Sequence, residues 1–95
     1  MGIDLDHAIQ NFSKVIQIKP KHSDAYWGRG MARKIKHEYK EANEDLEKAI
    51  QLDPRYLDSI NLRAIILGKL NRYDEALKNL DQAILIHPNF AEAFY

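Results

Sequence analysis

The residues best suited to metal binding or acid–base catalysis are scattered along this chain. It has four histidines, and they neither recur at i and i+4 nor sit at ligand spacing from an acidic relay: His7, His22, His37 and His87. The absence of cysteine removes disulfides, thiolate nucleophiles and cysteine-ligated metals together. We interpret the histidines as surface or turn residues and predict no metal and no cofactor.

Nucleophilic and phosphate-binding motifs are absent as well. Ser13, Ser23 and Ser59 lack a glycine elbow and the histidine arrangement that activates a serine nucleophile. The glycine-containing stretch "GRGMAR" (28–33) lacks the lysine and hydroxyl that a P-loop needs. We therefore expect no catalysis within these residues.

The charge balance argues against nucleic-acid and membrane partners. Lysine plus arginine equals aspartate plus glutamate, 14 against 14, so no net field attracts anionic polymers or lipids. Acidic residues soon interrupt the basic cluster Arg33, Lys34 and Lys36, which reads as a solvated face. The longest apolar runs are too short to span a bilayer. Without cysteine or a secretion signal, the compartment stays open, although a cytosolic location would fit.

The positions of proline reveal the organisation. The three prolines, Pro20, Pro54 and Pro88, are spaced by 34 residues. Aligning 23–56 with 57–90 gives identities throughout that period: Asp24/Asp58, Arg29/Arg63, Tyr39/Tyr73, Glu41/Glu75, Ala42/Ala76, Leu46/Leu80, Ala49/Ala83, Ile50/Ile84 and Pro54/Pro88. The sequence pattern repeats because a structural unit repeats. One such unit cannot bury its own apolar stripe, so the units must stack.

Each half of the unit predicts a helix. Apolar or small side chains recur at helical spacing in 39–52, and 57–70 carries a wider apolar surface. Ser23 is the expected N-cap of the first complete helix. Asn71 and His37 fall at the breaks within the pairs, where a left-handed conformation is often needed. Recurring glycine and alanine positions should let helix axes approach closely, with Tyr39 and Tyr73 filling the adjoining gap.

These residues resemble the tetratricopeptide repeat. "AYWGRGMAR" (25–33) and "EYKEANEDLEKAIQLDP" (38–54) are similar to its two helices, and the next unit repeats the pattern from Ile60 to Pro88. The resemblance implies an all-α, right-handed superhelical solenoid of antiparallel helix pairs. It also implies a single array over 1–95, cut from a longer chain: 3–22 as the second helix of a partial repeat, 23–56 and 57–90 as full repeats, and 91–95 as the start of another.

Four residues depart from the family pattern. Arg33 stands where the first helix usually carries an aromatic residue, and Asn43 replaces a usual aliphatic residue. Arg29 and Arg63 occupy a place that is usually apolar. We expect each arginine stem to pack while its head reaches a carboxylate on a neighbouring helix. A ligand-binding arginine pair is the alternative.

The resemblance further implies a concave groove that binds a protein or peptide. Its lining maps to Asp24, Trp27, Met31, Lys34, Ile35, Asp58, Asn61, Ile65, Lys69 and Glu92. Trp27 and Met31 would form an apolar shelf, unless Trp27 packs on Phe12 or Ile16. The three acidic residues would form a stripe for a basic ligand, unless they only complement helix N-termini.

Some domains of this kind bind the acidic C-terminus of heat-shock chaperones through basic and asparagine side chains. The corresponding places here carry Trp27, Met31, Leu62 and Glu92, so a chaperone tail is not expected. The first hypothesis is an interaction module without catalysis. The alternatives are a structural segment that self-associates through its exposed repeat ends, and a recruitment segment of a larger enzyme.

Overall fold

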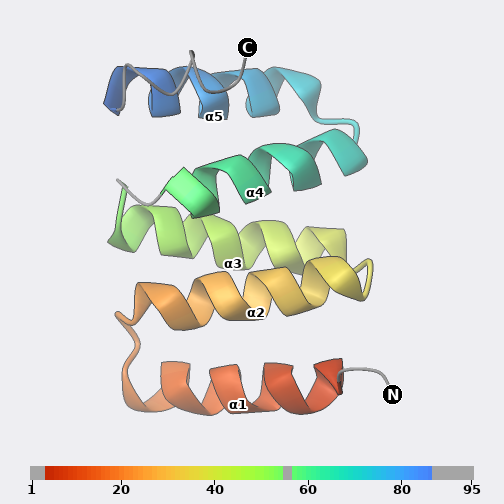
Figure 1. Ribbon diagram of the computed structural model, residues 1–95, viewed down its shortest axis with the longest axis vertical. Coiled ribbons are helices and arrows are strands. Elements are labelled where there is room, and N and C mark those ends of the chain that lie inside the picture. The colour runs from red at the N-terminus through yellow and green to blue at the C-terminus, as the bar shows by residue number, and fades with distance from the viewer. Residues whose placement is uncertain (1–3, 55–56, 87–95) are drawn as a thin grey trace.

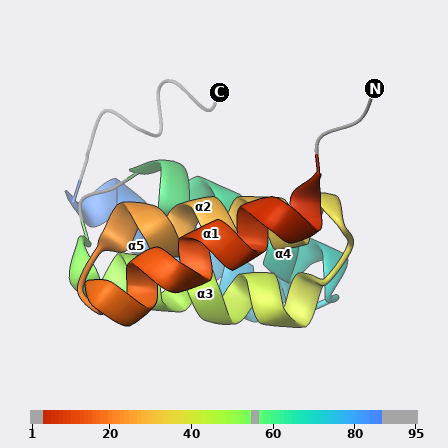
Figure 2. The same ribbon diagram turned by 90° about the horizontal axis from the view of Figure 1, so that it is seen from below.

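The computed structural model describes residues 4–54 and 57–86, which form five α-helices and no strand. The helices are α1 (Leu5–Ile18), α2 (Ser23–Ile35), α3 (Tyr39–Leu52), α4 (Leu57–Lys69) and α5 (Tyr73–Ile86). Each lies antiparallel to the next, from α1 at one end of the stack to α5 at the other (Figure 1). Figure 2 views the stack from the α1 end. The molecule measures 36 × 26 × 23 Å. The all-α stack of antiparallel helix pairs predicted from the 34-residue period is confirmed.

Short turns join the helices in two alternating ways. Pro20 and Pro54 lie in the turns after α1 and α3, where proline cannot continue a helix. His37 and Asn71 lie in the turns after α2 and α4, with φ of 65° and 60°. In both of these turns the next backbone N–H donates to a carbonyl five residues earlier at 2.8 Å, which closes a Schellman motif. The predicted left-handed breaks are confirmed at both positions.

The start of α2 differs from the prediction by one residue. Ser23 is already helical, and His22 is the N-cap. The Nδ1 atom of His22 accepts a hydrogen bond from the backbone N–H of Ala25 at 3.1 Å. The backbone of His22 is extended, with φ of −86° and ψ of 94°, as an N-cap requires. An imidazole therefore does here what a serine hydroxyl usually does.

The core lies where α2, α3 and α4 meet. Its centre is a cluster of Ala42, Leu46, Leu62 and Ile66, against which the half-buried side chains of Trp27, Met31, Tyr39 and Leu70 pack. A Cβ added at Gly30 would lie 3.1 Å from the Leu46 side chain, so α2 and α3 approach closely at this glycine. Ala49 and Ala83 are fully buried. The predicted close approach at small residues is therefore confirmed at Gly30.

The two tyrosines of the repeat do not behave alike. Tyr39 packs against the core cluster, but Tyr73 is 61% exposed and its hydroxyl donates to Asn71 Oδ1 at 2.9 Å. The prediction that both fill a gap between helices is wrong for Tyr73. The difference arises because α4 covers α3, whereas the described residues contain no helix beyond α5.

Candidate partner-binding groove

Arg29 joins the first three helices around one buried carboxylate. From α2, its Nε and Nη2 atoms donate to the two carboxylate oxygens of Asp45 in α3, at 3.0 and 2.7 Å. Its Nη1 atom donates to Ser13 Oγ in α1 at 3.1 Å. Arg33 adds a bond to Asp45 at 2.9 Å. Asp45 is only 3% exposed, and these bonds compensate the loss of its hydration.

Arg63, one repeat later, also joins three helices, and two of its hydrogen-bond acceptors are neutral asparagines. Its Nε atom donates to Asn43 Oδ1 at 3.0 Å and its Nη2 atom to Glu47 Oε1 at 3.0 Å, both in α3. Its Nη1 atom donates to Asn79 Oδ1 in α5 at 3.3 Å. The departures at positions 43 and 63 are thus one feature, because the unusual asparagine accepts from the unusual arginine.

The expectation that each arginine reaches a carboxylate on a neighbouring helix is confirmed. Both guanidinium groups are engaged inside the stack, which argues against a ligand-binding arginine pair. These arginines set the spacing of α2 and α4 relative to α3. The groove predicted from the sequence lies between α2 and α4.

Charged pairs at the turns lie on other parts of the surface. Arg72 donates to both carboxylate oxygens of Glu75, at 2.8 and 2.6 Å, and this bonding holds the pKa of Glu75 below its usual value. Lys36 bonds to Asp6, and this hydrogen bond raises the pKa of Lys36 above its ordinary value, with a smaller contribution from Glu38. These residues do not line the groove.

A cavity of about 410 Å³ lies between α2 and α4. The two helices are parallel, because each is antiparallel to the α3 helix that separates them (Figure 1). The lining consists of Trp27, Met31, Lys34, Asp58, Asn61, Leu62 and Ile65. Trp27 and Met31 also pack against the core cluster, so the floor of the cavity is a continuation of the core.

Most of the predicted groove residues meet at this cavity. Of the ten, six line it: Trp27, Met31, Lys34, Asp58, Asn61 and Ile65. Asp24, Ile35 and Lys69 lie at the ends of the same two helices, outside the lining, and Glu92 lies outside the described residues. The list missed Leu62, although the comparison with the chaperone-binding positions pointed to it.

Trp27 belongs both to the core and to the cavity. It packs against the cluster built from α3 and α4, and it is only half buried. The Phe12 ring lies against Gly28, the next residue of α2. One side of the indole therefore belongs to the core and the remainder lines the cavity.

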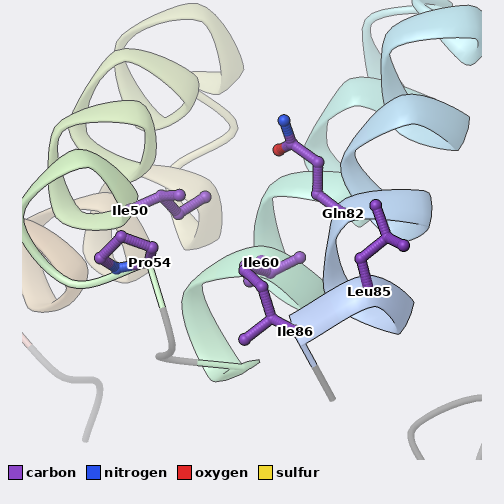
Figure 3. A pocket seen from close by; sticks show the side chains of 6 residues that line it. All are labelled: Ile50, Pro54, Ile60, Gln82, Leu85 and Ile86. Atoms are coloured by element: carbon purple, nitrogen blue, oxygen red, sulfur yellow. The ribbon is translucent and has the colours of Figure 1, made fainter. Parts of the chain in front are cut away.

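A second, smaller hollow lies at the C-terminal ends of α3 and α5. It has a volume of about 230 Å³ and is lined by Ile50, Pro54, Ile60, Gln82, Leu85 and Ile86. Figure 3 shows Ile50 and Pro54 on the α3 side, across the hollow from Gln82 and Leu85 of α5. Five of its six side chains are apolar, and Leu85 is 81% exposed.

Residues 4–54 and 57–86 hold neither a candidate metal site nor a membrane-spanning helix. They contain no group of three or more histidine, aspartate or glutamate side chains that could hold a metal ion. None of their helices is long and apolar enough to cross a bilayer.

The family follows from these features and from comparison with known proteins. A family model described as "Tetratricopeptide repeat" matches residues 36–95, and this chain belongs to that family. A curated relative, "Tetratricopeptide repeat protein 36" of Caenorhabditis elegans, is 36% identical over 45 residues. The match covers 47% of this chain and 25% of the relative, so the chain spans about a quarter of that protein.

Solved structures share the fold over nearly the whole chain. A crystal structure of MamA superposes with a TM-score of 0.86 at 24% identity, covering 95% of this chain and 53% of that one. The TPR2B domain of yeast Sti1, in a structure described as a complex with pHsp70, gives 0.82 at 26% identity, with coverages of 87% and 66%. The repeat architecture derived from the sequence is the one these proteins have.

Proposed function

We propose that this chain is a protein-interaction module that binds a segment of a partner protein in the groove between α2 and α4, without catalysis of its own. Membership of the tetratricopeptide repeat family supports an interaction scaffold as the general class. The observation that carries the site is the cavity with Trp27 and Met31 in its lining. Its volume of about 410 Å³ lies within the range of roughly 300–1,000 Å³ common for ligand pockets.

The lining favours a partner with an apolar anchor. Trp27 and Met31 are one helical turn apart, and Ile65 faces the same space from α4. Ile65 is 44% exposed, so covering it would remove apolar surface from water. Large apolar and aromatic side chains of this kind supply most of the binding energy at interfaces.

An acidic chaperone tail is not the partner that we propose. The Sti1 domain is described with pHsp70, and its likeness raises that possibility. Here the places that would hold carboxylates carry Trp27, Met31 and Leu62, and Asp58 lines the same cavity. Apolar side chains cannot replace basic donors, and Asp58 would repel a carboxylate.

The test uses the tryptophan as its own reporter, since the chain has a single tryptophan. Peptides retained from a random library by the immobilised protein are titrated while Trp27 fluorescence is followed. We expect a saturable change that is lost in Met31→Glu and kept in Gln51→Glu, which adds the same charge at an exposed site on α3. Retention that Met31→Glu leaves unchanged would place binding elsewhere and overturn the proposal.

The open face of α5 favours a second candidate function, self-association of repeat segments. Leu77 is 61% exposed and Ile84 is 39% exposed. The residues 34 positions earlier, Asn43 and Ile50, lie on the face of α3 that α4 covers, where Asn43 is 3% exposed. A helix from a second copy could cover α5 in the same way.

A further inference from the structure

The groove is polarised along its length. Asp24 and Asp58 lie in the first turns of α2 and α4, and Lys34 and Lys69 lie in their last turns. Because α2 and α4 are parallel, both aspartates lie at one end of the groove and both lysines at the other (Figure 1). The apolar part of the lining lies between these ends. Asp58 and Lys34 belong to the cavity itself.

These four charges are free to meet a partner. None of their side chains forms an ion pair or hydrogen bond with another residue in the described part of the chain. The charges that hold the fold together, by contrast, are already paired, as at Arg29 with Asp45 and Arg63 with Glu47. The polarity of the groove is therefore available for recognition.

We infer that the groove binds an amphipathic α-helix lying antiparallel to α2 and α4. Its acidic N-terminal turn lies at Lys34 and Lys69, and its basic C-terminal turn lies at Asp24 and Asp58. This inference rests on the proposed groove function and adds the conformation, charge pattern and direction of the ligand.

The backbone of the ligand decides between a helix and an extended peptide. An extended segment would need polar partners for its unpaired N–H and C=O groups. Among the described residues that line the cavity, Asn61 is the only amide side chain, and Trp27, Met31, Leu62 and Ile65 offer mainly apolar surface. A helix satisfies its own backbone and presents only an apolar face to Trp27, Met31 and Ile65.

The direction follows from two effects that act together. Acidic residues in the first turn and basic residues in the last turn are the arrangement that the helix dipole itself favours. An antiparallel helix of this kind places its acids at the lysines and its bases at the aspartates. A parallel one would bring like charges together at both ends.

The experiment compares two helical peptides of about 18 residues with identical composition and the same leucine face. The forward peptide has two glutamates in its first turn and two lysines in its last turn, and the reversed peptide exchanges them. Trp27 fluorescence titration should show the forward peptide binding about tenfold more tightly at low salt, since several exposed ion pairs change sign. The ratio should fall as salt is added.

A neutral variant provides the matched control. With Asp24→Asn, Asp58→Asn, Lys34→Gln and Lys69→Gln combined, both peptides should bind with equal affinity while circular dichroism shows the same helix content. A ratio near one in the unmodified protein would overturn the inferred direction. If neither helix binds but library peptides bind in a Met31-dependent manner, the helix inference fails and the groove function stands. If library peptides also fail to depend on Met31, both fail.

Discussion

Arg29, Arg63 and their partners show how single polar side chains set the distances between helices. Each arginine reaches both the preceding and the following helix, and its acceptors recur 34 residues apart at positions 13/47 and 45/79. The repeat therefore has a polar period as well as an apolar one. At positions 45 and 79 the acceptors differ in charge, because the Asp45 carboxylate binds two arginines whereas Asn79 offers an amide oxygen.

The buried carboxylate gives a prediction at this scale. We expect Asp45→Ala to lower the free energy of unfolding by about 3 kcal/mol, because two partly buried guanidinium groups lose their acceptor. Asp45→Asn should cost about 1 kcal/mol, since an amide still accepts one bond and asparagine already fills the equivalent position 79. Urea denaturation followed by circular dichroism measures both. Equal losses in the two variants would contradict this account.

At the scale of the helix, α1 packs against α2 in part through one aromatic side chain that lies on a glycine. A Cβ added at Gly28 would lie within 2.9 Å of three ring atoms of Phe12. Gly28 is buried, and Phe12 is half buried. In contrast, a Cβ added at Gly68 in α4 meets nothing within 4 Å. A side chain at position 28 would therefore collide with Phe12, whereas a side chain at position 68 would have free space.

Alanine at these two positions should change stability in opposite directions. Gly68→Ala should stabilise the protein by up to about 1 kcal/mol, the usual gain of alanine over glycine in a helix. Gly28→Ala receives the same gain, but the overpacking against Phe12 should cost about 1–3 kcal/mol and exceed it. Thermal denaturation gives the two signs directly. Pairing Gly28→Ala with Phe12→Leu should restore part of the loss, and no restoration would mean that Phe12 is not the obstacle.

At the scale of the whole molecule, the first and last of the described helices expose large apolar side chains. On α5, Leu77, Ile84 and Leu85 are exposed, and on α1, Ile18 is 77% exposed. The helices inside the stack bury the corresponding surfaces against a neighbour. Contiguous apolar faces of this kind favour association.

We expect self-association that depends on α5. Light scattering over a concentration series should show larger species at higher protein concentration, and Leu77→Glu should shift them toward monomer. Gln51→Glu serves as the control, since it adds the same charge on α3 away from that face. A monomer at every concentration, or an association that Leu77→Glu leaves intact, would sink this prediction.

The sequence alone was enough for the fold and for most of the groove. Spacing of prolines and small residues predicted the helix pairs, since each repeat must bury its apolar stripe on the next. The same period placed six of the ten predicted groove residues beside one cavity. The role of these residues in binding remains a prediction.

What only the tertiary structure decided is which partner each repeated residue meets. Tyr39 and Tyr73 occupy the same position of the repeat, yet one is packed and the other exposed, because burial depends on the helix that lies next to them. The partner of Asn43 is likewise a residue 20 positions away, which no local pattern specifies. Local periodicity determines the helices and their apolar faces, whereas long-range geometry determines which polar atoms come within hydrogen-bonding distance.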